Sequence, residues 1–508
     1  MLGKILYRTA VVLGVLLLAA VVGIWLLRQQ FTIEGPALHG IAGIGGTDPD
    51  AALLAERVEL PPGFSIGLYA RDLGPARVLR FTPAGDLLVS VSRKGRVLLL
   101  APDRDGDGRA DGVRVLLQDL DRPHGLDLHD GWLYFAENAA VRRVRFDARA
   151  GAVSGAPEPV AGLPEGGIHW TRTLRFGPDG KLYVISGSSC NVCIEDDPRR
   201  TQLLRMNPDG SGIETFAEGL RNTVGFDWQP GSGALYGVDN GRDLLGDDFP
   251  PDELNHIVAG GHYGWPFVHG FNVPDPEYGD HEQAPGAAAI PPAYGFGAHV
   301  AALSIHFIDP ARAPRGFGDA ALVGQHGSWN RSVLSGYRVS SLHWQADGRI
   351  VERDFATGFE RDGDVIGRPV DVLQGPDGAF YISDDYAGSV YRVSFDAAGV
   401  QGPGPVFEPP RAEGPHAAAA PPASAAPRPA ALDADPQLRA GAELFATHRC
   451  LSCHDARAAG MDLAGIGARY SADELVALLE FPPTPMPAPA IDAGERAALA
   501  AYLRVAFP

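Results

Sequence analysis

The sequence predicts an all-β six-bladed propeller that is preceded by one apolar helix and followed, after a linker, by a small all-α domain. Three observations predict this arrangement. Strand–turn–strand hairpins recur through residues 57–400, apolar residues return to helical spacing after residue 436, and residues 10–27 form an unbroken run of apolar or small side chains. Short alternating strands joined by Pro-Asp-Gly turns are typical of β-hairpins.

The first 30 residues (1–30) are expected to anchor the chain in a membrane. Ala10–Leu27 contains no charged residue, and a helix of this length spans roughly 27 Å, enough to cross a bilayer. Lys4 and Arg8 precede it, which favours a cytoplasmic N-terminus. A cleaved signal peptide is the alternative, although Arg28-Gln-Gln offers no small-x-small cleavage site. Both readings export the remaining chain, so we expect its domains in the bacterial periplasm, at the inner membrane.

Five copies of one hairpin pattern predict the propeller over residues 57–400. The first four copies start about 45 to 52 residues apart, the size of one four-stranded blade. The copies begin at Arg80, Gly125, Leu174, Phe226 and Val372. A blade cannot bury both faces alone, so the blades must close into a ring whose central mouth can take a ligand. We expect the Gly- and Pro-rich segment 266–300 to be a long loop over that mouth.

The propeller lies between a connecting segment, 31–56, and a Pro- and Ala-rich linker, 401–435. The linker shows no apolar periodicity, so we expect it to be semi-extended. Residues 436–508 are predicted to form the all-helical domain. There, Ser471 and Asp492 each stand three residues before a glutamate, which is the pattern of a helix capping box.

The helical domain contains Cys450-Leu-Ser-Cys453-His454, the attachment pattern of a c-type haem. Cys450 and Cys453 would form thioethers to the porphyrin, and His454 would ligate the iron. Met486 is the expected ligand on the other face, because a thioether raises the haem potential and suits electron transfer. A zinc half-site is the alternative, but no Cys or His follows His454. Residues 436–508 are therefore predicted to be a cytochrome c domain.

Composition narrows the other possibilities. The formal net charge of −19 argues against nucleic acid as a partner. The four cysteines form two Cys-x-x-Cys pairs, and in an exported chain Cys190 and Cys193 predict a disulfide that staples a loop. No Gly-x-Gly-x-x-Gly opens a βαβ unit, so nicotinamide or flavin binding of that type is not expected.

Several loops ahead of the hairpins carry residues suited to chemistry. His169 could act as a general base at neutral pH or be structural, and Arg221-Asn222 precede the fourth hairpin. Segments 239–243 and 251–255 offer the carbonyl and carboxylate oxygens that calcium prefers. Asp103–Asp111 is similar to half of a calcium loop but lacks the closing glutamate, so a solvated acidic turn is the alternative.

Four separated motifs, in order, resemble the quinoprotein glucose/sorbosone dehydrogenases over about residues 57–396. They are Gly167–Val184, Gly219–Asn222, Asp252–Asn255 with Tyr263–Pro266, and Gly367–Asp371. The resemblance implies a six-bladed propeller that uses pyrroloquinoline quinone and calcium. The whole arrangement is most similar to the membrane-bound sorbosone-type members that carry a fused cytochrome.

The resemblance also implies roles for individual residues. His169 would take the sugar hydroxyl proton as hydride leaves for the quinone, Arg221 would polarise a quinone oxygen, and Asn222 would help to hold the cofactor. The remaining residues with implied roles are Gly241 and Arg242, whose carbonyls would bind the calcium beneath the quinone, Glu253 and Tyr263, which would bind a second calcium, and Arg368, which would face the cofactor carboxylates.

The chain departs from the family pattern at four places. His124 stands where soluble members have a glutamine. His326 or Arg331 would replace a cofactor-contacting lysine, and Arg368 alone stands where soluble members have two arginines. An insertion, 244–250, separates the expected calcium loop from Asp252.

The expected function is oxidation of a sugar or sugar aldehyde, with electrons passing to the chain's own haem c and then to a respiratory quinone, cytochrome or oxidase. Two alternatives belong to other classes. A calcium-dependent propeller lactonase or other hydrolase would yield no electrons, so the fused haem argues against it. A non-catalytic propeller that docks a partner onto the cytochrome would not need His169 with Arg221-Asn222.

Overall fold

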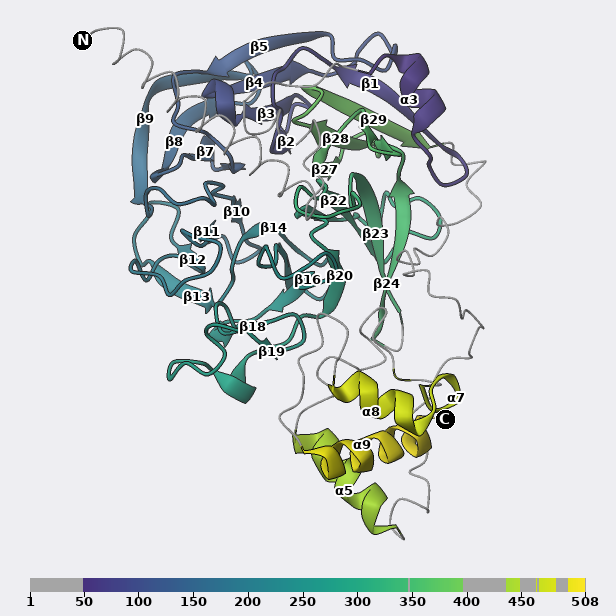
Figure 1. Ribbon diagram of the computed structural model, residues 1–508. Helices are drawn as coiled ribbons and strands as arrows, with labels where there is room; N and C mark the ends of the chain where they lie inside the picture. Colours follow the sequence, from purple (N-terminus) through teal and green to yellow (C-terminus); the bar gives the residue numbers. More distant parts are fainter. Residues whose placement is uncertain are drawn as a thin grey trace, which may run out of the picture.

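The computed structural model describes residues 49–345, 348–395, 435–447, 463, 466–480 and 492–507 (Figure 1). The predicted anchor, most of segment 31–56, the linker up to residue 434, the Cys450–His454 motif and Met486 lie outside these residues. Among the helices that are described, none is both long and apolar enough to cross a membrane.

The propeller consists of six sheets, which confirms the predicted number of blades; five have four strands, and blade three has the short β17 (Gly261–His262) as a fifth. Blades one to three contain β2 (Leu79–Phe81), β3 (Leu87–Val91), β4 (Arg96–Ala101) and β5 (Gly112–Leu117), then β6 (Leu126–His129), β7 (Trp132–Ala136), β8 (Ala140–Asp147) and β9 (Ala152–Gly162), then β10 (Leu174–Phe176), β11 (Leu182–Ser186), β12 (Gln202–Met206) and β13 (Glu214–Glu218). Blades four to six contain β14 (Thr223–Trp228), β15 (Leu235–Asp239), β16 (Pro251–Ile257) and β20 (Tyr294–Ala298), then β21 (Ala302–Phe307), β22 (Ala320–Gln325), β23 (Arg338–Trp344) and β24 (Ile350–Ala356), then β27 (Pro369–Gln374), β28 (Phe380–Asp384), β29 (Ser389–Phe395) and β1 (Phe64–Ala70).

The two ends of the propeller close the ring within blade six. The first strand, β1, pairs antiparallel with the last, β29, and Phe64 lies opposite Phe395. The Phe64 ring packs edge-on against Phe355, with ring centroids 5.2 Å apart. Figure 1 shows the purple N-terminal strand beside the green strands of this blade. Closure in this way leaves each blade between two neighbours, so both faces are buried.

Five of the six inner hairpins are the copies that the sequence reveals. They are β2–β3, β6–β7, β10–β11, β14–β15 and β27–β28. Blade five has the same hairpin, β21–β22, but residues 308–319 separate its strands, so no short turn marks it. The second strand of a blade, such as β3 or β11, is buried at every residue, because both of its faces pack against neighbouring blades.

Aspartates on the innermost strands join neighbouring blades in three pairs: two with three, four with five, and six with one. Asp127 Oδ2 accepts from the Phe176 amide at 2.7 Å, and Asp371 Oδ2 accepts from the Leu79 amide at 2.8 Å. Asp227 Oδ2 does the same for blades four and five, at 2.9 Å from the Phe307 amide. These bonds pair buried backbone groups at the axis, where water cannot satisfy them.

Two connecting regions differ from the expectation. Part of segment 31–56 is a helix, α3 (Ala51–Arg57), whose Leu54 is fully buried against blades five and six. The expectation of a long loop over the mouth at 266–300 is wrong. That segment forms β18 (Val268–His269), β19 (Val273–Pro274) and the 3₁₀ turn η2 (Gly286–Ala288), and it then enters β20, the outer strand of blade four. Among the described side chains of the segment, only His299 lines the central cavity. The remaining short elements are the 3₁₀ turn η1 (Ser92–Lys94), β17 (Gly261–His262), β25 (Glu360–Arg361) and β26 (Asp364–Val365).

The C-terminal unit is helical, as predicted. It contains α5 (Pro436–Thr447), α7 (Ile466–Arg469), α8 (Ala472–Glu480) and α9 (Ala493–Ala506). Asp492 and Glu495 form the predicted capping box at the start of α9. A Cβ on Gly441 would lie 2.2 Å from the Ala498 carbonyl oxygen, so glycine is required where α5 crosses α9. Phe445, Leu475, Leu479, Leu499 and Leu503 form the shared core.

Candidate active site

A cavity of about 340 Å³ lies at one end of the propeller axis. The loops before the innermost strands and those after the second strands supply nearly all of its lining, because the innermost strands run in the same direction. Blades one, three, four, five and six contribute. The polar and aromatic residues in its lining include Arg77, Arg93, His169, Trp170, Arg221, Asn222, Asn240, Asp243, Asp252, His299, His326, Trp329, Arg368 and Asp385. Of the predicted site residues, the cavity brings together His169, Arg221, Asn222, Gly241, His326 and Arg368.

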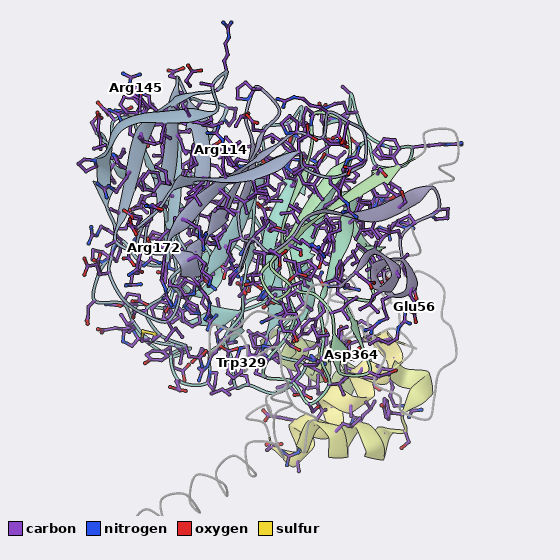
Figure 2. The ribbon with its side chains drawn as sticks, turned by 90° about the horizontal axis from the view of Figure 1, so that it is seen from above. Glu56, Arg114, Arg145, Arg172, Trp329 and Asp364 are labelled. Atoms are coloured by element: carbon purple, nitrogen blue, oxygen red, sulfur yellow. A yellow bond between two sulfur atoms is a disulfide. The ribbon has the colours of Figure 1, made fainter. Side chains whose placement is uncertain are left out.

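His169 is held as a neutral imidazole with one free nitrogen. Its Nδ1 lies 2.8 Å from the Ser188 carbonyl oxygen, which can only accept, so Nδ1 carries the proton and Nε2 keeps its lone pair. Burial, and then the positive charge of Arg221, lower the pKa of His169 to about 3. The fully buried Arg172 (Figure 2) donates to the carbonyls of His169 and Thr171 and so fixes this backbone.

In the apoprotein, His169 is therefore expected to stay neutral between pH 5 and pH 8. Only below its pKa of about 3 should the ring accept a second proton. Long-range ¹H–¹⁵N NMR of histidine-labelled apoprotein should show an unprotonated Nε2 throughout this range. A titration midpoint near the ordinary value of 6.5 would show instead that water solvates the ring.

Arg221 lies in blade four and points its guanidinium into a frame of oxygen acceptors. Nη1 donates to the Asn240 carbonyl at 2.9 Å, and Nε and Nη2 donate to Asn191 at 3.2 and 2.9 Å. Asp243 Oδ2 is 3.6 Å from Nη2, and the guanidinium lies over the Trp265 ring at 5.2 Å. The charge is thus buried but compensated, and it is fixed in direction.

Gly187 brings the loops of blades three and four together. A Cβ at this position would lie 2.8 Å from Asn222 Oδ1 and 3.0 Å from the His169 Cβ. No other residue leaves room for both side chains. The Asn222 backbone amide donates to Asp239 Oδ1 at 2.8 Å, and this bond fixes the backbone of Asn222. The side chains of Asn222 and His169 therefore lie next to each other, on either side of Gly187.

Arginines from blades one and six gather around Asp385. Arg77 Nη1 and His326 Nε2 lie 2.6 and 2.7 Å from its two oxygens. Burial and the repulsion from the neighbouring Arg368 lower the pKa of His326 to about 4. Burial also lowers the pKa of Arg93. Among the neighbouring charges, Asp385 raises this pKa, whereas Arg122, Arg77 and Arg368 lower it. One carboxylate therefore faces several cations, which leaves this side of the cavity positive.

The residues expected at calcium sites lie beside the cavity, on β15, β16 and the loops around them. The Gly241 amide donates to Asp252 Oδ1 at 2.8 Å, and the Arg242 side chain binds Asp275 and Glu277 at 2.5 Å. Glu253 accepts from the Gly270 amide at 2.8 Å. The Tyr263 hydroxyl donates to the His256 carbonyl at 2.6 Å and is packed in a core. Two groups of described side chains could hold a metal ion by their spacing. Asp103/Asp105/Asp107 belongs to the acidic segment that is similar to half of a calcium loop, whereas in Cys190/Cys193/Glu195 the two cysteines are joined in a disulfide. Neither group contains the calcium residues that the family resemblance implies.

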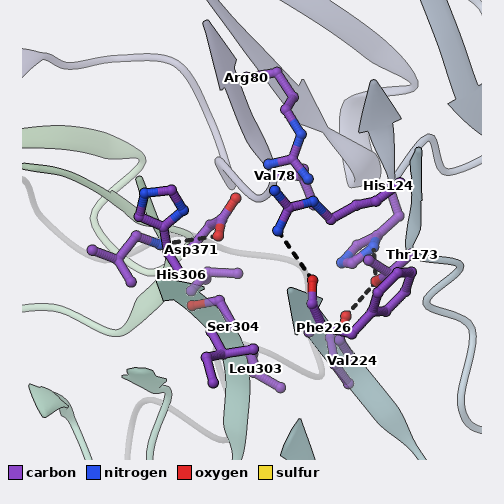
Figure 3. A pocket seen from close by; sticks show the side chains of 15 residues that line it. Val78, Arg80, His124, Thr173, Val224, Phe226, Leu303, Ser304, His306 and Asp371 are labelled. Carbon is purple, nitrogen blue, oxygen red and sulfur yellow. Dashed lines mark hydrogen bonds between the residues drawn. The ribbon is translucent and has the colours of Figure 1, made fainter. Parts of the chain in front are cut away.

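Two residues expected to contact the cofactor lie outside the cavity lining. His124 is 2% exposed and lies edge-on to Trp170, which itself lines the cavity. It borders a narrow channel of about 30 Å³ along the axis, with Thr173, Arg80, His306 and Asp371 (Figure 3). Arg331 binds the backbone of Asp247 and the carboxylate of Asp248, so it joins the 244–250 insertion to blade five.

Sequence reasoning missed Arg77, Arg93, Trp170, Trp329 and Asp385. A signal existed for one of them. Arg77 stands three residues before Arg80 on the innermost strand of blade one, as Arg368 stands three residues before Asp371 in blade six. Aligning the repeats on these strands would therefore have paired Arg77 with Arg368. Trp329 and Asp385 lie in loops without a repeated pattern.

Comparisons with known proteins cover both folded parts. The TrAA12-like family matches residues 58–256, and the family of the cbb3-type cytochrome c oxidase subunit III matches residues 436–503. An uncharacterised protein of Borreliella burgdorferi is 33% identical over 300 residues, which are 56% of this chain and 78% of that protein. Quinoprotein glucose dehydrogenase B of Acinetobacter calcoaceticus is 27% identical over 165 residues, 26% of this chain and 33% of the dehydrogenase.

Two solved structures share the fold. The calcium structure of a Trichoderma reesei carbohydrate-active enzyme of family AA12 has a TM-score of 0.60 and 21% identity, covering 70% of this chain and 99% of that one. The holo form of the pyranose dehydrogenase PQQ domain from Coprinopsis cinerea has a TM-score of 0.57 and 19% identity, covering 69% of this chain and 98% of that one.

Proposed function

We propose a function from one premise: the chain belongs to the pyrroloquinoline quinone-dependent glucose/sorbosone dehydrogenase family, with a cytochrome c domain at its C-terminus. The propeller oxidises a sugar or sugar aldehyde, and the electrons pass to haem c. The main observation in support of this function is that four arginines and a neutral histidine line one cavity. The chain is held at the periplasmic side of the inner membrane by residues 1–30.

The described residues fit this cofactor. Pyrroloquinoline quinone is a planar tricarboxylate, which needs several cationic donors and a flat apolar wall. Arg77, Arg93 and Arg368 supply cations from blades one and six, and Trp170 supplies a ring face within 5.4 Å of the Arg77 guanidinium carbon. When bound, the quinone supplies the acceptor for hydride. His169 and Arg221 come from blades three and four, so the base and the carboxylate-binding arginines are on different blades.

His169 is the residue that moves a proton. His169 lines the cavity and has its Nε2 lone pair free, so a substrate hydroxyl bound there can donate to Nε2, and the proton is held on that nitrogen as the C–H bond breaks. Arg221 is fixed where negative charge develops on an oxygen during the transfer. Trp329 and Ile168, 44% and 58% exposed, form an apolar rim on which a sugar ring can stack.

The calcium ion would bind the Gly241 and Arg242 carbonyls, beside Asp243. The Arg242 side chain is already paired with Asp275, so only its backbone is available. Burial raises the pKa of Asp239 and of Asp252 to about 6 and the pKa of Glu253 to about 8, although the charge of Arg221 lowers the pKa of Asp239. A divalent cation next to these carboxyl groups would favour their ionised forms.

Reconstitution tests the proposed function. The purified apoprotein is assayed with aldoses and sugar aldehydes, an artificial electron acceptor and calcium, with and without pyrroloquinoline quinone. We expect turnover only in the presence of the quinone. Hydrolysis of lactones without any acceptor reduction would support the hydrolase instead.

Arg368→Ala is expected to weaken binding of pyrroloquinoline quinone by roughly 10- to 100-fold. A charge-assisted hydrogen bond to a carboxylate contributes about 1.5–3 kcal/mol. Quenching of tryptophan fluorescence during titration of the apoprotein gives the affinity. Arg145→Ala is the control, because Arg145 is exposed on β8 and lies toward the opposite end of the propeller from Trp329 in Figure 2. Equal affinity of Arg368→Ala and the control would exclude Arg368 from the cofactor site.

A further inference from the structure

The Cys190–Cys193 disulfide closes a four-residue loop that borders both His169 and Arg221. The bond predicted from the sequence is present. Just before the loop, the Ser188 carbonyl oxygen accepts a hydrogen bond from His169 Nδ1 at 2.8 Å. Just after it, Glu195 Oε1 accepts from Ser188 Oγ at 2.6 Å and from the Ser189 amide at 2.7 Å. The loop is thus fixed at both ends next to the proposed base.

Asn191, inside the disulfide loop, connects two parts of the candidate site. Its backbone oxygen accepts from Arg221 Nε at 3.2 Å, and its Oδ1 accepts from Arg221 Nη2 at 2.9 Å. The same Oδ1 accepts from the Asp243 amide at 2.9 Å, and Nδ2 donates to the Asp243 carbonyl at 3.1 Å. One side chain therefore sets the guanidinium and the 241–243 loop at a fixed separation.

We propose that Asn191 is the positioning residue for Arg221, and that the Cys190–Cys193 disulfide keeps Asn191 in place. Arg221 has a long side chain whose nearest carboxylate, on Asp243, is 3.6 Å away. Without the Asn191 acceptors the guanidinium would turn toward that carboxylate. Two donors of a rigid, planar guanidinium on one residue fix both its position and its plane. This inference rests on the proposed function for the role of Arg221 in turnover.

The disulfide makes this arrangement sensitive to reduction. A dithiol such as dithiothreitol transfers two electrons and two protons to the Cys190–Cys193 bond, giving two thiols, and is itself oxidised to a disulfide. The opened loop then no longer fixes Asn191 against Arg221. We expect reduction and removal of Asn191 to have the same consequence for the site.

The test compares Asn191→Ala and Asn191→Asp with Val192→Ala as the matched control, since Val192 lies in the same loop and has no polar side-chain atom. In the reconstituted full chain, Asn191→Ala should lower kcat by roughly 10- to 100-fold, the scale of a displacement of about 1 Å, with a smaller change in KM. Asn191→Asp keeps an oxygen acceptor and should recover most of the rate. Treatment with dithiothreitol, removed before the assay, should match Asn191→Ala and be reversed by reoxidation.

Crystal structures of the apoprotein variants supply a readout independent of turnover. The Arg221 guanidinium should be displaced in Asn191→Ala and in place in Asn191→Asp. An unmoved guanidinium, or an unchanged kcat in Asn191→Ala, overturns the inference. If the wild type with quinone and calcium oxidises no sugar, the proposed function fails, and the position of Arg221 in the two structures still decides whether Asn191 positions it.

Discussion

Replacing His169 with alanine is expected to lower kcat by roughly 10²–10⁴-fold, the usual contribution of a general base. The free Nε2 of this neutral ring is the group placed to accept the hydroxyl proton, since Nδ1 is committed to the Ser188 carbonyl. Without it the proton must leave to water while hydride is transferred. Binding of the quinone should change little, because the carboxylate-binding arginines belong to blades one and six.

Two further variants separate catalysis from folding. His169→Gln can still donate an N–H to the Ser188 carbonyl but offers no base, so it should be as slow as His169→Ala. His256→Ala is the control, since His256 is exposed on β16 and stacks on Tyr236 away from the cavity. Steady-state assays with a soluble dye give kcat for each. Near-normal turnover in both His169 variants would make this histidine structural.

The sequence was informative about the blades because the hairpins are local. A Pro-Asp-Gly turn between two short alternating strands can be read without knowledge of any distant contact, and five of the six inner hairpins were found in this way. The hairpin of blade five was missed because residues 308–319 replace the short turn. The closing strand β1 could not be assigned either, since its partner β29 lies more than 300 residues away.

The site was predicted in part for a related reason. The loop position of a residue within a repeat indicates which end of the ring it occupies. His169, Arg221, Asn222 and Arg368 all precede an inner hairpin, and all four line the same cavity. The position does not indicate which side chain covers another. His124 is at the same end, but the neighbouring Trp170 occupies the cavity wall. The Arg331 side chain binds the 244–250 insertion instead of lining the cavity, and the repeats do not predict the path of that insertion.

Replacing Cys450 and Cys453 together with alanine is expected to abolish covalent haem attachment and, with it, electron delivery to the respiratory chain. Both thioethers of the predicted attachment motif are lost. Sugar oxidation with a soluble dye should continue, because the quinone site belongs to the propeller. Haem staining after denaturing electrophoresis and oxygen uptake by membranes give the two readouts. Met461→Ala is the control, since Met461 is close to the motif but is not the expected iron ligand.

The relay in this proposal is intramolecular, which gives it a kinetic signature. The linker 401–435, read from its composition as a flexible coil, would average roughly 30–35 Å end to end, so the haem can reach the cavity mouth and still swing out to an acceptor. Tethering keeps its effective concentration there on the order of mM. Stopped-flow mixing with substrate should therefore show haem reduction at a rate independent of protein concentration. A haem that stays oxidised during turnover would contradict the relay. The electrons released at the propeller cavity would then pass to an acceptor other than this haem.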